Sequence, residues 1–268
     1  MRLVSLLFAV ACSGAPTDVI TTDSTATTET GTTTTDTDTV PEPTDLATLQ
    51  GSVVDPDGVG LGAVLRLCRG SACRTLDADS DGSYVYEDVA LIPQSFEISA
   101  PSGHDDLAIA FAPLEFKTVH EVRAIPVILP VITHQTPLTS TATEIEVGTG
   151  LFITVSKADL EPPDAFHEDP TEVTGVAVDV ALQMPVDRPH SSVIAMWYVG
   201  PFDYMSEGGL PVRIQNLWGL ADGAVYSVWT GSYLDSAWLD QGTLTVSGEW
   251  LEGDAALTVV STVVLVAL

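Results

Sequence analysis

The sequence predicts an all-β protein in which two β-sandwich domains follow an export signal and a disordered stalk rich in Thr and Asp. After Asp45, short runs of β-branched and aromatic residues are interrupted about every 8 to 12 residues by Gly, Pro, Asp or Asn, a pattern typical of sandwiches and barrels. No stretch after the leader keeps the 3.6-residue apolar period of a capped helix. We expect the signal at 1–11, the linker at 12–45, the first sandwich at 46–108 and the second at 109–268.

The N-terminus has the features of an export signal. Arg2 precedes the apolar run Leu3–Ala11, which is too short to span a bilayer as a helix, since that takes about 20 residues. The tetrapeptide Ala9-Val10-Ala11-Cys12 resembles a bacterial lipobox, in which the cysteine becomes the lipidated N-terminus after cleavage. This resemblance implies an exported protein held at the bacterial outer membrane or cell surface by a lipid on Cys12. The alternatives are plain secretion, a true start further upstream, or a Cys12 buried in a core.

The stalk follows directly. Between Ala15 and Asp45 there are fourteen Thr, seven acidic residues and no Lys or Arg. Such a composition buries too little apolar surface to offset chain entropy, so we expect disorder. A coil of this length reaches roughly 30 Å, enough to hold a domain away from a membrane.

Alternating apolar residues identify individual strands. Leu151, Ile153 and Val155 alternate with Phe152 and Thr154, and a second alternating run covers residues 176–182. In a third run, Val193, Ala195, Trp197 and Val199 are expected to share one buried face. The closing run Leu257–Leu268 is rich in Val and Thr, and we interpret it as a buried last strand.

Two of the three cysteines are predicted to form a disulfide. Cys68 and Cys73 enclose only Arg-Gly-Ser-Ala, so they can face each other across a hairpin. Closing so short a loop stabilises the fold by about 2 kcal/mol and requires an oxidising compartment. Cys12 is then the unpaired cysteine.

Residues 49–107 resemble the carboxypeptidase regulatory-like domain, an Ig-like sandwich common in secreted bacterial proteins. Two Asp-Gly turns, a pair of tyrosines on one strand face and a Pro-Ser-Gly turn carry the resemblance. The matching residues are Gly51, Val53, Asp55, Gly58, Leu61, Gly62, Ala63, Leu65, Leu67, Asp81, Gly82, Tyr84, Tyr86, Phe96, Ile98 and Ala100–Gly103. His104 departs from the aromatic that this pattern usually has. The resemblance implies a domain that stiffens or displays its neighbours.

The remaining chain is similar to extracellular ZU5-type β-sandwich domains of bacterial surface proteins. The similarity rests on GTGLFITVSKADLEPPD, VTGVAVDVALQMP and MWYVGPFDYMSEGGLPVRIQNLWGLADGAVYSVWT. No residue role is transferred from it.

The segment Asp77–Asp88 begins like a calcium loop. Asp77, Asp79 and Asp81 supply oxygen at positions 1, 3 and 5, with Gly82 at position 6. The closing position holds the shorter Asp88, and the flanks are strand-like, so the EF-hand frame is absent. We therefore favour a hairpin turn without a cofactor, with Ca²⁺ at these three aspartates as the alternative.

All five tryptophans lie in the second domain, and two of them stand near turns. Trp218 precedes Gly219 and Trp238 follows Ala237, so these are the side chains for a sugar-stacking platform. The alternative for every tryptophan is core packing, which we favour for Trp197.

Charge and missing motifs restrict the function. The formal net charge of −28 repels phosphate backbones, so no nucleic-acid partner is expected. No zinc signature, nucleophile elbow or phosphate-binding glycine loop occurs in the sequence. We therefore predict a non-enzymatic surface protein with a structural, adhesive or scaffolding role. Its partners would be the membrane, through the lipid, and an extracellular protein or carbohydrate. A carbohydrate- or ligand-binding module using second-domain aromatics is the alternative.

Replacing Cys12 with Ser should release the protein from the membrane fraction, because the thioether attachment point is lost. Cell fractionation followed by immunoblotting measures this. The neighbouring substitution Ser13→Ala should leave the protein in the membrane fraction. Unchanged partitioning of Cys12→Ser would show that lipidation at this position does not hold the protein.

Overall fold

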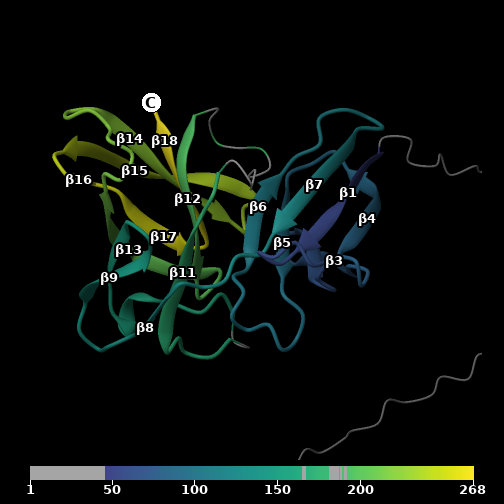
Figure 1. Cartoon of the computed structure of the whole chain (residues 1–268), viewed down its shortest axis with the longest axis horizontal. Coiled ribbons are helices and arrows are strands. Elements are labelled where there is room, and N and C mark those ends of the chain that lie inside the picture. Colours follow the sequence, from purple (N-terminus) through teal and green to yellow (C-terminus); the bar gives the residue numbers. More distant parts are fainter. Residues whose placement is uncertain (1–45, 165–166, 181–186, 188, 190–191) are drawn as a thin grey trace, which may run out of the picture. The chain divides into compact units, whose positions relative to one another are not determined.

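A computed structural model describes residues 46–164, 167–180, 187, 189 and 192–268, and these residues form almost only β-strands (Figure 1). The predicted signal, linker and Cys12 lie outside the described residues. No helix in the described part of the chain is long and apolar enough to cross a membrane. The all-β prediction is confirmed.

Two sheets form the first sandwich. One has the order β4-β1-β7 and the other β3-β2-β5-β6. The strands are β1 Leu46–Val54, β2 Val64–Arg69, β3 Ala72–Asp77, β4 Ser83–Ala90, β5 Gln94–Ser99, β6 Ala110–Leu114 and β7 Val122–Ile128. Strand β7 runs parallel to β1, whereas all the other pairs are antiparallel. The expected boundary at residue 108 therefore falls inside this sandwich, because β6 and β7 complete its sheets.

Tyr84 and Tyr86 fill the first core, as their alternation predicts. Each ring is almost fully buried and packs against Phe96, with ring centroids 5.9 and 6.5 Å away. The hydroxyl of Tyr84 donates to the Ile125 carbonyl at 2.7 Å, and that of Tyr86 donates to the Leu65 carbonyl at 2.8 Å. Both tyrosines thus tie β4 to its neighbours, because a buried hydroxyl needs a partner.

The second sandwich is one large curled sheet with the order β8-β11-β12-β18-β14-β15-β16-β13-β10-β9, and β17 pairs with β13 at one side. Its elements are β8 His134–Pro137, β9 Thr143–Gly148, β10 Leu151–Val155, the short 3₁₀ helix η1 Lys157–Asp159, β11 Glu172–Val178, β12 Val193–Gly200, β13 Tyr204–Gln215, β14 Val225–Ser232, β15 Ala237–Ser247, β16 Trp250–Gly253, β17 Ala256–Val260 and β18 Thr262–Ala267.

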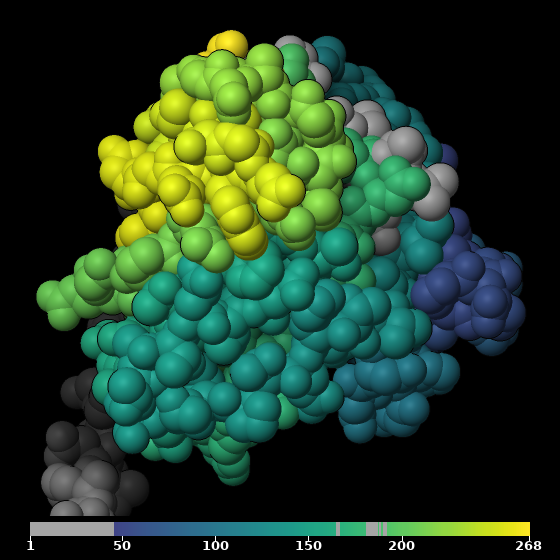
Figure 2. Space-filling model, turned by 60° about the vertical axis from the view of Figure 1, so that its left-hand side comes forward, coloured from purple at the N-terminus to yellow at the C-terminus, as the bar shows by residue number. Residues whose placement is uncertain are grey.

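The sheet curls until β9, at one end, lies against β11, near the other. Their backbones come so close that a Cβ on Gly175 of β11 would stand 1.8 Å from the Val147 carbonyl oxygen of β9. Only glycine fits there. Figure 2 shows the resulting face, on which mid-chain segments (teal) lie beside C-terminal ones (light green and yellow), in line with the pairing of β10 with β13 and of β13 with β16.

Strand alternation is confirmed for β10, whose Leu151, Ile153 and Val155 are buried inside the curl. In β12, Ala195, Trp197 and Val199 also face this inner core. Val193 does not share their face, because the register shifts between Val193 and Ala195 and turns Val193 toward the first sandwich. The closing run forms two strands, since β17 ends at Val260 and β18 begins at Thr262.

The two sandwiches share one hydrophobic core. Met196, Tyr198, Val264 and Val266 point from the outer face of β12 and β18 into the same buried cluster as the core of the first sandwich. Strand β6 lies between them with all five of its residues buried. The described residues accordingly belong to one compact unit rather than two independent domains.

Met196→Ala should destabilise both sandwiches together, by about 2–5 kcal/mol, because it opens a cavity in their shared core. Urea unfolding followed by tryptophan fluorescence reports on the second sandwich, and hydrogen exchange of β4 amides reports on the first. Val85→Ala, at a half-exposed position of β4, is the control and should change little. Normal protection of β4 in Met196→Ala would show that the sandwiches unfold separately.

Candidate functional site

A cleft with two lobes opens where the sandwiches meet. Ile109, Pro201 and Phe202 line both lobes, which have volumes of about 340 and 550 Å³. We call this the junction cleft, with a smaller and a larger lobe. Pro201 and Phe202 belong to the turn between β12 and β13, and Ile109 precedes β6. The cleft therefore exists only because the sandwiches pack together.

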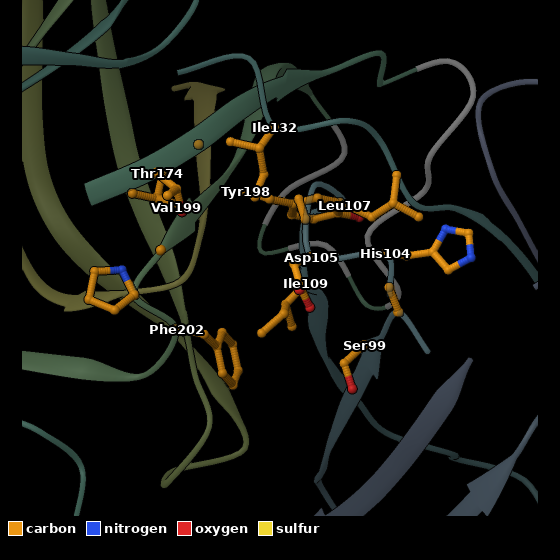
Figure 3. A pocket seen from close by; sticks show the side chains of 15 residues that line it. Ser99, His104, Asp105, Leu107, Ile109, Ile132, Thr174, Tyr198, Val199 and Phe202 are labelled. Carbon is orange, nitrogen blue, oxygen red and sulfur yellow. The ribbon is translucent and has the colours of Figure 1, made fainter. Parts of the chain in front are cut away.

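The smaller lobe is lined from both sandwiches (Figure 3). His104 and Asp105 come from the loop after β5, whereas Thr174 and Tyr198 come from β11 and β12. Burial raises the pKa of the Tyr198 phenol well above its usual range, so it stays neutral. Phe202 stands at the boundary with the larger lobe.

The larger lobe contains most of the charge. Arg66 of β2 and Glu97 of β5 form an ion pair whose carboxylate is almost completely buried. The ring of His167 lies 2.8 Å from the carboxylate of Asp164, and both residues also line the lobe. Asp203 completes the set from the β12–β13 turn.

Asp203 has an unusual electrostatic environment. Burial, together with the charge of Glu97, raises the pKa of its carboxyl to about 6, and His167 acts in the opposite direction. Burial also raises the pKa of Glu97, although Arg66 opposes this. A titratable group shifted in this way inside a cleft indicates a candidate functional site.

Phe202 and Tyr233 form an aromatic wall of the larger lobe beside these carboxyls, and the buried Phe111 packs against both rings. Phe111, Phe202 and Tyr233 contact one another, with ring centroids 5.3 to 6.0 Å apart and tilted or edge-on geometries. Phe111 comes from β6, and Tyr233 lies in the turn between β14 and β15. Each of the three rings comes from a different part of the chain.

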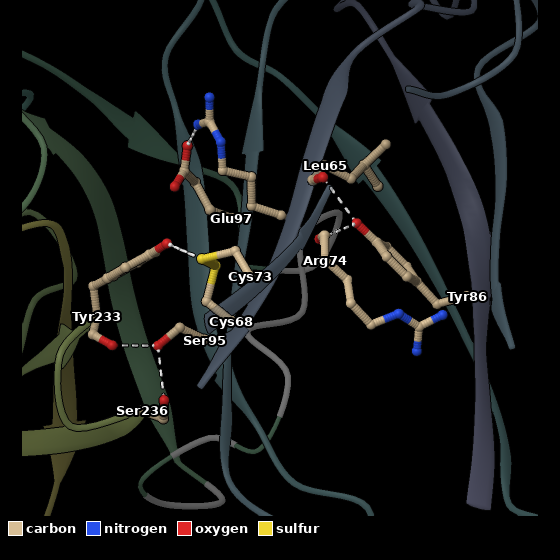
Figure 4. Close-up of a disulfide and its surroundings, with 10 residues drawn as sticks. Leu65, Cys68, Cys73, Arg74, Tyr86, Ser95, Glu97, Tyr233 and Ser236 are labelled. Carbon is tan, nitrogen blue, oxygen red and sulfur yellow. Dashed lines mark hydrogen bonds and ion pairs between the residues drawn. A yellow bond between two sulfur atoms is a disulfide. The ribbon is translucent and has the colours of Figure 1, made fainter. Parts of the chain in front are cut away.

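The predicted disulfide is present and lies next to this wall (Figure 4). Cys68 and Cys73 pair across the β2–β3 hairpin with their Cα atoms 4.0 Å apart. The hydroxyl of Tyr233 lies 2.7 Å from Cys68 Sγ, and its carbonyl accepts a 2.6 Å hydrogen bond from Ser95 Oγ. The disulfide edge of the first sandwich thus holds the Tyr233 turn in place.

Trp218 and Trp238 do not form a common stacking platform. Trp218 is partly exposed and packs edge-on against Trp197, with the ring centroids 6.1 Å apart. Trp238 packs against the shared core and donates its indole N–H to the Asp187 carbonyl at 2.7 Å. Each ring is held in place by its own packing partners, which gives no support to the prediction that the two rings form a sugar-stacking platform.

Two aspartates of the calcium-like segment, Asp79 and Asp81, lie in a turn, whereas Asp77 is the last residue of β3. Asp81 accepts a hydrogen bond from the Ser83 backbone N–H at 3.0 Å, and the Gly82 N–H donates to the Asp79 carbonyl at 2.8 Å. Gly82 has φ +84°, which the turn requires. Within the part of the chain that the structure describes, no group of three or more His, Cys, Asp or Glu side chains is arranged for a metal ion, Asp77, Asp79 and Asp81 included.

Sequence reasoning missed the residues of the junction cleft. The only local signal is Gly200-Pro201-Phe202-Asp203-Tyr204, a turn composition that carries an acid between two aromatics. Its partners Arg66 and Glu97 lie in the first sandwich, more than a hundred residues earlier. No spacing rule connects residues so far apart.

No family model matches the chain, and no curated protein matches it significantly. Among solved structures, it is similar to the TIE protein of Bacillus anthracis, with 8% identity, a TM-score of 0.28, and coverage of 76% of this chain and 42% of that one. It is also similar to a protein from Bacteroides uniformis described as a candidate carbohydrate-binding protein, with 9% identity, a TM-score of 0.23, and coverage of 83% and 79%. The chain thus spans less than half of the first protein. Neither similarity is close enough to indicate a shared function.

Asp203→Asn should stabilise the protein at about pH 7 by roughly 1 kcal/mol, a figure reduced for partial solvent exposure. The folded pKa is about 6 and the usual value is 3.8, so the folded state binds the proton more tightly, and stability is lost as pH rises between these values. Asn also tolerates the φ of +64° at this position.

Urea unfolding at about pH 4 and about pH 7 checks this. The advantage of Asp203→Asn should be present at the higher pH and absent at the lower one. An equal effect at both values would mean that ionisation of Asp203 does not oppose folding.

Proposed function

We propose that this protein is a non-enzymatic, lipid-anchored bacterial surface protein with an adhesive role, and that its two-sandwich head binds a saccharide in the junction cleft. The stalk at 12–45 would hold the head away from the outer membrane. The single observation that carries the binding role is the larger lobe, whose lining combines three aromatic rings, a buried and a half-buried carboxylate and a guanidinium, those of Phe202, Tyr204, Tyr233, Glu97, Asp203 and Arg66.

This combination suits a sugar. Aromatic rings pack against the apolar C–H face of a sugar ring, while a few fixed polar groups bind its hydroxyls and set its orientation. The Glu97 and Asp203 carboxylates are acceptors, and the Arg66 guanidinium still has N–H groups to donate. The volume of about 550 Å³ lies within the range of small-molecule sites.

The shared core supports an adhesive role. A site between two loosely linked domains would change shape as they move, whereas here Met196 and Tyr198 bury into the core of the first sandwich. The cleft is therefore preformed, which lowers the entropic cost of binding. The resemblance of residues 49–107 to carboxypeptidase regulatory-like domains is consistent with a first sandwich that supports and displays the second one.

The anchor and the surface location rest on the sequence of residues 1–12 alone. The net charge of −28 continues to argue against nucleic acid as a partner. A structural or scaffolding role without a small ligand is the competing function, and it is distinguished by the binding experiment below.

Phe202→Ala should weaken saccharide binding at least about tenfold, because it removes the ring shared by both lobes; that factor corresponds to about 1.4 kcal/mol. Calorimetric titration of the full chain with short oligomers of glucose, N-acetylglucosamine and glucosamine measures it. Phe202→Leu keeps the apolar packing against Phe111 and Tyr233 but loses the ring, so it should also weaken binding.

The matched control is Trp218→Ala, which removes an aromatic ring outside the cleft and should leave affinity unchanged. A loss with Trp218→Ala and none with Phe202→Leu would place binding at the tryptophans instead. If none of the oligomers binds the wild-type chain, the saccharide proposal is wrong and the scaffolding role stands.

A further inference from the structure

We infer that the larger lobe selects a positively charged saccharide, a hexosamine with a free amino group, and that Asp203 binds its ammonium. This inference rests on the proposed function, because it names the class of sugar for the same cleft.

Among the residues that the structure describes, ion pairing in the lobe leaves Asp203 without a cationic partner in direct contact. Glu97 pairs with Arg66, and Asp164 pairs with the ring of His167. Among the described residues, no N–H or O–H group donates a hydrogen bond to the Asp203 carboxylate. The lobe thus contains one more carboxylate than its ion pairs account for.

The surroundings of Asp203 are acidic on more than one side. The charges of Glu97 and Asp235 both disfavour its ionised form, and only His167 favours it. An ammonium bound at Asp203 would relieve this repulsion and replace the water that the half-buried carboxylate lost on folding. A ligand carboxylate would add to the repulsion, so acidic sugars are disfavoured.

The position of Asp203 is fixed by the backbone. Its N–H donates to the Val260 carbonyl at 2.8 Å, which ties the β12–β13 turn to β17. Phe202 and Tyr204, its chain neighbours, also line the lobe. A cation beside a carboxylate and aromatic faces gains from both, since the face of an aromatic ring attracts positive charge.

The remaining lining favours an amino sugar over a simple amine. The ammonium of a lysine side chain would pair with the Asp203 carboxylate, but it would bring no acceptor for the N–H groups of Arg66 that do not bond Glu97. A hexosamine brings hydroxyl and ring oxygens that accept from Arg66 and a C–H face for Phe202 and Tyr233. The net charge of −28 additionally raises the local concentration of any cationic ligand.

Calorimetric titration of the full chain at about pH 6, where an amino sugar is protonated, compares short oligomers of glucosamine, N-acetylglucosamine and glucose. Glucosamine should bind at least about tenfold tighter than the other two. Asp203→Asn should reduce this preference to about twofold or less, because it weakens glucosamine binding much more than it weakens binding of the neutral oligomers. Glu249→Gln, which removes the same charge from an exposed turn, should leave the preference intact.

The outcomes separate this inference from the proposed function. If no oligomer binds, the saccharide function itself fails. If neutral or N-acetylated oligomers bind as tightly as glucosamine, the function stands and the charge selectivity is wrong. A preference that persists in Asp203→Asn, or that falls equally in Glu249→Gln, would show general attraction to an acidic protein. Equal binding of a short lysine peptide would overturn the sugar in favour of a protein ligand.

Discussion

The burial of β6 and of the outer face of β12 and β18 determines how the rest of the molecule is arranged. A strand buried on both faces needs apolar side chains in both directions, and Ala110–Leu114 and Thr262–Ala267 provide them. Met196 and Val264 then complete the first core from the second sandwich. The interface has the character of a protein interior, so the two sandwiches fold around a common core.

The junction cleft is a consequence of this packing. Both sandwiches present loops at the rim of the shared core, and the β12–β13 and β14–β15 turns there meet the sheet that contains β2 and β5. Tyr233 is held at that place by the disulfide edge and by Ser95. The disulfide is a short local link in the sequence, yet its sulfur atoms contact the other sandwich.

Asp203, at the rim of the shared core, lowers the stability of the fold at a position that we propose binds a ligand. Its ionised form is disfavoured by burial and by Glu97, so at neutral pH the folded state is less stable than it would be with a neutral side chain. Most of a fold avoids such positions, and those that persist tend to cluster where a ligand is bound. The rings of Phe202 and Tyr233, which line the same lobe, give the same indication independently of the pKa.

Local patterns in the sequence determined the strands, the Asp-Gly turns and the disulfide, because each depends on residues close together in the chain. The tyrosine pair of β4 and the alternation of β10 are examples. The boundary at 108, the face of Val193 and the junction cleft were decided only by tertiary structure. Strand β7 pairs with β1 far back in the chain, a register shift turns Val193, and Asp203 meets Glu97 across the packed sandwiches. Alternation identifies the buried face of a strand but not the surface that covers it, so these long-range contacts could not be read from the sequence.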